Sequence, residues 1–249
     1  MKIGLAQIES ITGDIDGNIS HHLTVLDPLS ADDVDLVMFP ELSLSNYEPA
    51  IAQSTAINLA DQRLTAFQEF ADQRGIAIGI GAPVRTREKP LISTLMFMPH
   101  RTCTVIDKVY LHEDELPYFS AKSKPATVLE LAKKIGIAIC YEISVDAHIE
   151  SASAQNMAIY LASVAKTAAG ILAAKERLSV KAKEFKMPIL IVNSLGICEG
   201  KAAGGGSAII ETDGTVVTTL KEQEEAILIY DLENKHASKF PINASSINV

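Results

Sequence analysis

Short apolar runs rich in β-branched residues recur along the whole chain, and several show no alternation of polar and apolar positions. Clear examples are VDLVMF, GIAIGIGAPV, IGIAIC and PILIVN. A strand that is apolar at consecutive positions has both faces covered in the folded protein. The pattern therefore predicts many strands that are buried on both sides.

Helical periodicity occupies some of the gaps between these runs. A helix is predicted over residues 61–74, and its apolar face carries Leu64, Phe67 and Phe70. Gly75 follows directly and is placed to end this helix.

Two further helices are expected. One extends from about Thr167 to Lys186, with Pro188 as the stop beyond it. The other is expected to begin near Asn18, because asparagine is a good N-cap residue. Helices interleaved with covered strands indicate an α/β protein with layered sheets.

Length and composition are consistent with one domain that spans residues 1–249. The chain has 249 residues, 47% of them hydrophobic, which is enough to bury a sizeable core. No linker rich in proline, serine or glycine interrupts it. The sequence therefore predicts a single domain.

The net charge narrows the range of partners. At −9, the chain would on average repel a nucleic-acid backbone or an anionic membrane surface. No segment reaches the roughly 20 apolar residues that span a bilayer, and the N-terminal apolar run is too short for a secretory signal. We therefore expect no nucleic-acid partner, no membrane partner and a cytoplasmic location.

Metal and cofactor motifs are absent from the sequence. The three cysteines are widely spaced without a CxxC pair, and the six histidines form no HExxH or similar spacing. There is also no GxSxG elbow of a serine hydrolase. Neither a metal site nor a cofactor is expected.

Three reactive residue types stand at the ends of apolar runs: Glu41, Lys108 and Cys140. Residues just beyond the carboxyl ends of strands converge in α/β sheets, so these side chains can meet in space. A cation favours the thiolate and a carboxylate can accept its proton, which is the arrangement nucleophilic catalysis needs. Taken singly, each signal is weak, because a cysteine in an apolar run is more often an inert core residue, a glutamate after proline can be a helix-entry charge, and a lysine can snorkel from a strand end.

The wording of the surrounding motifs favours the catalytic interpretation. FPELSLSNYEP (39–49), DKVYLHEDELPYF (107–119) and GIAICYEI (136–143) together resemble the nitrilase superfamily of carbon-nitrogen hydrolases, in that family's order. The resemblance continues through PILIVNSLG and GGGSAIIETDGTVV. It implies a four-layer αββα sandwich that forms a homodimer or a higher homo-oligomer by stacking helical layers.

The same resemblance assigns roles to the residues. It makes Glu41 the general base, Lys108 the cationic stabiliser and Cys140 the nucleophile. A second glutamate orients lysine and substrate in many members of the family, and here Glu115 is preferred, with Glu113 as the alternative.

Two tyrosines complete the predicted site. The backbone N–H of Tyr141 is expected to help to bind the oxyanion, and Tyr47 is expected to line the pocket. Asn46 stands where the family commonly has glycine, which leaves the path of this loop open. Glu142 is explained equally well by a direct role or by an ion pair with a neighbouring cation.

The resemblance predicts an amidase that acts on a small linear amide. Nitrilases of the family commonly have tryptophan after the cysteine, whereas this chain has Tyr141 and no tryptophan, which favours amide over nitrile. N-carbamoyl hydrolysis, nitrile hydrolysis, acyl transfer and a ligand-binding or scaffolding member without turnover remain alternatives. Specificity is expected to depend on the loops 120–125 and 194–203.

Overall fold

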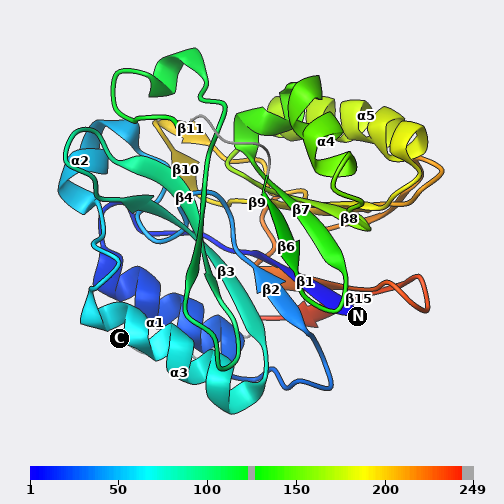
Figure 1. The fold of residues 1–249 in the computed structure, drawn as a ribbon, viewed down its shortest axis with the longest axis horizontal. Helices are drawn as coiled ribbons and strands as arrows, with labels where there is room; N and C mark the ends of the chain where they lie inside the picture. The colour runs from blue at the N-terminus through cyan, green and yellow to red at the C-terminus, as the bar shows by residue number, and fades with distance from the viewer. Residues whose placement is uncertain (123–126, 243–249) are drawn as a thin grey trace.

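The computed structural model of the protein describes residues 1–122 and 127–242. Two β-sheets pack face to face, and helices cover the outer face of each sheet (Figure 1). From one side to the other, the layers are α1 with α3, a seven-stranded sheet, a six-stranded sheet, and α4 with α5. The predicted four-layer αββα sandwich is confirmed.

The seven-stranded sheet has the order β15-β14-β1-β2-β3-β4-β5. Neighbours β1, β2 and β3 are parallel, and the other pairs are antiparallel. Its strands are β1 (Lys2–Gln7), β2 (Leu36–Met38), β3 (Ala77–Val84), β4 (Leu91–Phe97), β5 (Thr104–Asp107), β14 (Ala226–Asp231) and β15 (His236–Pro241).

The six-stranded sheet has the order β13-β12-β9-β8-β7-β6, with β7, β8 and β9 parallel. Its strands are β6 (Val128–Glu130), β7 (Lys134–Ile139), β8 (Ile159–Val164), β9 (Ile189–Asn193), β12 (Ala208–Ile210) and β13 (Val216–Thr219). A separate two-stranded ribbon joins β10 (Ile197–Cys198) and β11 (Lys201–Ala202).

The α-helices are short except for the first and the last. They are α1 (Ile15–Leu26), α2 (Ala52–Thr55), α3 (Thr65–Arg74), α4 (Asp146–Ser153) and α5 (Ala168–Phe185). The 3₁₀ turns are η1 (Pro49–Ile51), η2 (Gln62–Leu64), η3 (Glu113–Glu115) and η4 (Cys140–Ser144). Among the described helices, none is long and apolar enough to cross a membrane.

The continuous apolar runs are explained by two separate cores. In β2, Leu36 and Met38 pack between the sheets, whereas Val37 points to the opposite face and packs with the α1 and α3 layer. Successive strand side chains face opposite sides, so a strand with a core on each side must be apolar at every position.

The helix predictions are confirmed at two places and wrong at one. Thr167 caps α5, and Gly75 ends α3 in the left-handed conformation, as expected. However, α1 begins at Ile15, because Asp14 accepts the capping hydrogen bond from Gly17 N–H at 2.9 Å. Asn18 lies inside the helix, where its buried amide bonds the backbone of Ile11.

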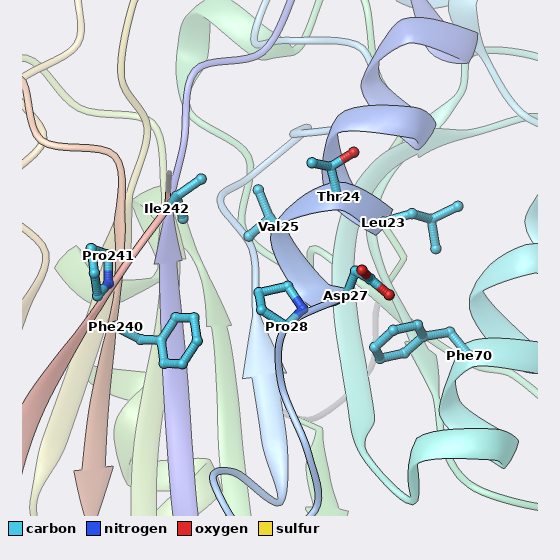
Figure 2. A pocket seen from close by; sticks show the side chains of 9 residues that line it. All are labelled: Leu23, Thr24, Val25, Asp27, Pro28, Phe70, Phe240, Pro241 and Ile242. Atoms are coloured by element: carbon cyan, nitrogen blue, oxygen red, sulfur yellow. The ribbon is translucent and has the colours of Figure 1, made fainter. Parts of the chain in front are cut away.

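Several elements were not predicted from the pattern. The short strands β6, β10 and β11 and the edge strand β15 have no long apolar run, and β15 is largely exposed. An open groove of 760 Å³ lies between the end of α1, α3 and β15, and Figure 2 shows Phe70 and Phe240 on its two sides. None of the predicted site residues lines this groove.

Candidate active site

Glu41 lies in the loop that leaves β2, and its side chain is buried. Two contacts hold this loop. Leu44 N–H donates to Gly81 O of β3 at 2.9 Å, and Ser163 Oγ of β8 donates to Phe39 O at 2.8 Å. The second bond connects the two sheets, so the carboxylate is held from both layers.

Lys108 follows β5 directly and is 0% exposed. Its Nζ lies 2.7 Å from Glu41 Oε1 and 2.6 Å from Glu115 Oε1. A buried ammonium is tolerated only with such partners. Although burial acts to lower it, the pKa of Lys108 is raised overall by the charges of Glu41 and Glu115, so the side chain stays protonated.

The structure distinguishes the two candidates for the second glutamate. Glu115 is buried, and its Oε2 accepts the His112 N–H at 2.8 Å, while Glu113 is exposed. The Tyr47 hydroxyl donates to Glu115 Oε1 at 3.0 Å. Glu115 is therefore the residue that meets Lys108, and Tyr47 supports it.

Asn46 does not disrupt the loop that carries Glu41 and Tyr47. It adopts the left-handed conformation (φ 63°), which asparagine tolerates better than most residues. Its Nδ2 donates to Thr12 Oγ1 at 2.8 Å and to Ile197 O at 2.7 Å. The amide thus replaces the conformational freedom of glycine with bonds that tie the loop to the β10-β11 ribbon.

Cys140 is the first residue after β7 and opens the turn η4. Its φ of 44° is in the left-handed region, an uncommon conformation for cysteine of the kind that recurs at functional sites. Burial, followed by the charge of Glu41, raises the pKa of the thiol to about 12. The thiol is therefore protonated at neutral pH and needs a base to become a nucleophile.

Glu41 is placed to be that base. Burial raises the pKa of Glu41 overall, although the charge of Lys108 and, to a smaller extent, the interaction with the Cys140 thiol act to lower it. Among the described residues, the buried Oε2 of Glu41 has no hydrogen-bond partner. One oxygen is thus bound to Lys108, and the other is available for a proton.

Tyr141 is partly buried, and its ring stands edge-on to the His112 ring at 5.1 Å between centroids. The ring thus lies beside the η3 turn.

Two loops were predicted to set specificity. The β10-β11 ribbon lies within the loop of residues 194–203, and residues 123–125 of the other loop are outside the described residues.

Lys166 is a site residue that the sequence analysis missed. It follows β8, the parallel neighbour of β7, and its charge lowers the pKa of Cys140. The side-chain amide of Asn193 holds its backbone, accepting from Lys166 N–H at 2.8 Å and donating to Lys166 O at 3.0 Å. No motif marks this lysine, although its place at the end of an apolar run could have suggested it.

Replacing Lys166 by methionine is expected to make Cys140 harder to ionise. Loss of the cation removes a stabilising influence on the thiolate, so the pH dependence of Cys140 alkylation should move to higher pH. Iodoacetamide labelling followed by mass spectrometry across pH measures this shift. Lys186→Met, at the far end of α5, is the matched control, and an unshifted Lys166→Met profile would contradict the prediction.

Within residues 1–122 and 127–242, no group of three or more His, Cys, Asp or Glu side chains is arranged to hold a metal ion. The polar chemistry of the site comes from the carboxylates, the lysines and the thiol.

A comparison with family models identifies the chain. The model for the carbon-nitrogen hydrolases matches residues 2–240, nearly the whole length. The chain belongs to the carbon-nitrogen hydrolase family. As a family member it is an enzyme that acts on carbon-nitrogen bonds other than peptide bonds, which confirms the resemblance seen in the sequence.

Curated relatives of this carbon-nitrogen hydrolase are distant. An (R)-stereoselective amidase of Pseudomonas sp. is 23% identical over 96% of this chain and 88% of the amidase. A glutamine-dependent NAD(+) synthetase of Thermotoga maritima is 24% identical over 94% of this chain. The chain spans only 42% of the length of that synthetase.

Solved structures share the fold. The amidase of Nesterenkonia sp. AN1 superposes with a TM-score of 0.84, covering 93% of each chain at 21% identity. In structures of that amidase, acrylamide or the acetamide moiety of fluoroacetamide is attached to its active-site cysteine, and another holds butyramide. The likeness establishes the nitrilase-type fold for this hydrolase.

Proposed function

We propose that this hydrolase is an amidase that converts a small linear amide to a carboxylic acid and ammonia or an amine. The observation that carries the proposal is the buried ion-paired group in which Lys108 contacts both Glu41 and Glu115. The Glu41 carboxylate of this group lies beside the Cys140 thiol. A buried, charged constellation with an unpartnered carboxylate oxygen is costly to maintain for stability alone.

The first half of the reaction forms a thioester. Cys140 Sγ attacks the amide carbon while Glu41 Oε2 takes the thiol proton, so no free thiolate accumulates. The carbonyl oxygen becomes an oxyanion that Lys108 Nζ and the Tyr141 N–H stabilise, at about 3–4 kcal/mol per preorganised donor. Glu41 then returns its proton to the leaving nitrogen, the carbon-nitrogen bond breaks, and ammonia or an amine departs.

The second half hydrolyses the thioester. Glu41, again a carboxylate, takes a proton from water, and the hydroxide attacks the thioester carbon. Collapse of the second tetrahedral intermediate breaks the carbon-sulfur bond, and the Glu41 proton returns to Cys140. One carboxylate therefore acts as base and as acid in each half, which suits a group whose pKa is raised by burial.

Names of relatives support amides as the substrate class. The similar proteins include an amidase and synthetases described as glutamine-dependent, and the structural neighbour holds butyramide in one structure. Simple aliphatic amides and the ω-amide of glutamine are therefore the first candidates. N-carbamoyl compounds and nitriles are the alternatives within the family.

The test is ammonia release from a panel of aliphatic, ω-amide, aromatic, carbamoyl and nitrile substrates, with Cys140→Ala beside the native enzyme. We expect release from one amide class and none in the variant. A trapped acyl-enzyme, seen as an added acyl mass on Cys140, would support the thioester. Release from nitriles or carbamoyl compounds alone would contradict the amidase proposal.

The acid side of the pH profile should report Glu41. A base acts only when ionised, and a raised pKa means that ionisation is lost as pH falls through a value above the ordinary 4.5. We therefore expect kcat/KM to decline with a midpoint above pH 4.5. Circular dichroism over the same range checks that the fold persists, and a midpoint at or below 4.5 would contradict the assignment.

Gly81→Ala should displace the base. A Cβ at this position would lie 2.9 Å from the Glu41 carbonyl carbon and closer still to Leu42 N and Pro40 O, all backbone atoms that cannot rotate away. We expect stability to fall by about 1–3 kcal/mol and kcat/KM by about 10- to 100-fold. Denaturant unfolding and substrate kinetics measure the two effects.

Gly79→Ala is the matched control for that substitution. It lies two residues earlier in β3, and its Cβ would meet the sulfur atoms of Met38 and Met96, the mobile ends of flexible side chains. It should cost stability with little loss of turnover. Equal loss of turnover in both variants would attribute the effect to the core and not to the Glu41 loop.

We further propose the homodimer that the resemblance implies. Leu172 and Val180 of α5, in one outer helical layer, are 57% and 64% exposed, which supports an apolar contact through this layer (Figure 1). Sedimentation equilibrium of the native protein and of Val180→Glu tests it. The cytoplasmic location stays a prediction.

A further inference from the structure

Glu142 is a buried carboxylate, 2% exposed, to which the proposed reaction assigns no role. Its Oε2 accepts the backbone N–H of Ile139 at 2.7 Å. Its Oε1 accepts the N–H of Val109 at 2.6 Å and of Tyr110 at 3.3 Å. Both oxygens are thus occupied by main-chain donors from two separate segments.

These two segments carry the lysine and the nucleophile. Ile139 immediately precedes Cys140, and Val109 immediately follows Lys108. Lys108 directly follows β5, an edge strand of the seven-stranded sheet, whereas Cys140 directly follows β7 of the six-stranded sheet. Glu142 therefore connects the two layers at the point where their reactive residues meet.

The neutral pair of His148 and Tyr160 lies against the Glu142 carboxylate. His148 Nε2 lies 3.3 Å from Glu142 Oε2, and His148 Nδ1 lies 2.7 Å from the Tyr160 hydroxyl. Burial lowers the pKa of His148 to about 4, so the ring is neutral at pH 7. The consistent tautomer has Tyr160 O–H donating to Nδ1 and Nε2–H donating to Glu142.

The simplest explanation of Glu142 is a helix cap, because a glutamate at the third position of a turn commonly accepts the N-cap N–H. Capping accounts for the bond to Ile139. It does not account for the bonds to Val109 and Tyr110, which lie 33 and 32 residues away in the chain. The carboxylate does more than close its own turn.

We propose that Glu142 is a positioning residue that sets the placement of the Lys108 ammonium relative to the Cys140 thiol. The proposal rests on the amidase function for its kinetic consequences. Cys140 sits at a positive φ, and the bond from Ile139 holds the turn that imposes this conformation. The bonds from the Val109 and Tyr110 N–H groups hold the segment that carries Lys108 in a fixed position relative to this turn.

Glu142→Gln tests this positioning role without changing the size of the side chain. Glutamine has one accepting oxygen, so either Ile139 N–H or the Val109 and Tyr110 pair must face an amide donor. We expect kcat to fall about 100-fold with KM little changed, because a displacement of this kind removes contacts made in the transition state. Alkylation of Cys140 by iodoacetamide should also slow by about 10-fold, since the thiol loses its alignment with Glu41.

Tyr160→Phe is the matched control. It removes the hydroxyl on the far side of His148 and leaves all three backbone bonds to Glu142 intact. Both variants are assayed well below their melting temperatures, so a loss of stability alone does not move kcat. We expect Tyr160→Phe to retain native kcat and the native alkylation rate.

Native kcat and native alkylation in Glu142→Gln would overturn the proposal, and so would an equal kcat loss in Tyr160→Phe. Alkylation separates this inference from the amidase function. If the native enzyme hydrolyses no amide while Glu142→Gln still slows alkylation, the positioning role stands and the amidase proposal fails. If alkylation is unchanged as well, the positioning role fails too.

Discussion

Lys108→Met is expected to lower the free energy of unfolding by about 3–5 kcal/mol and to abolish measurable turnover. Removing the ammonium leaves Glu41 and Glu115 as two buried carboxylates without their shared cation, and breaking a buried ion pair in this way is strongly destabilising. The same change removes the charge that stabilises the oxyanion. Urea unfolding and ammonia release measure the two losses separately.

A charge-matched variant separates stability from chemistry at this lysine. A variant that combines Glu41→Gln, Lys108→Met and Glu115→Gln has no charge left among these three side chains, so stability should return toward that of the native protein, while turnover stays absent. A single Lys108→Met variant as stable as the native enzyme would contradict the assignment of a charged lysine between two carboxylates.

Cys140→Ala is expected to remove turnover, with kcat reduced on the order of 10⁶-fold, while the protein remains folded. The sulfur of Cys140 is the atom that forms the proposed thioester. The other two cysteines, Cys103 and Cys198, are distant from it in the sequence. Ammonia release and circular dichroism report activity and fold. Residual turnover at a native level in Cys140→Ala would eliminate the mechanism.

Cys140→Gly extends this test to the backbone. Glycine adopts a φ of 44° without the strain that a Cβ introduces, so this variant should be inactive yet more stable than Cys140→Ala by about 1 kcal/mol. Equal stability of the two variants would indicate that the left-handed conformation of Cys140 stores no strain.

Local pattern predicted an α/β protein with layered sheets and placed three reactive residue types at strand ends, whereas the four-layer sandwich and the roles of those residues came from the resemblance. Runs such as IGIAIC are apolar at every position because each strand has a core on both faces, and this requirement is readable without knowing the neighbours. Glu41, Lys108 and Cys140 stand at the ends of such runs, where strand geometry brings side chains together.

Contacts between distant segments were not readable in this way. Glu113 and Glu115 are equivalent by pattern, and the preference for Glu115 rests on resemblance, whereas in the structure the η3 turn buries Glu115 against Lys108. Asn46 and Lys166 likewise acquire their partners from other loops. Hydrogen bonds of this kind depend on side-chain direction across layers, which no periodicity encodes.

Glu142 and the start of α1 illustrate the same limit. The sequence left both a direct role and an ion pair open for Glu142, but in the folded chain its carboxylate accepts one main-chain N–H from the end of β7 and others from the segment that follows β5 in the opposite sheet. Asn18 has a side chain suited to an N-cap, but the side chain of Asp14 accepts the N–H of Gly17 and caps the helix. The Asn18 amide instead donates to the Ile11 carbonyl oxygen in the preceding loop. Residue type and spacing thus specify the layers and mark Cys140 as the candidate nucleophile, whereas the packing of one sheet against the other selects the partners of each polar group.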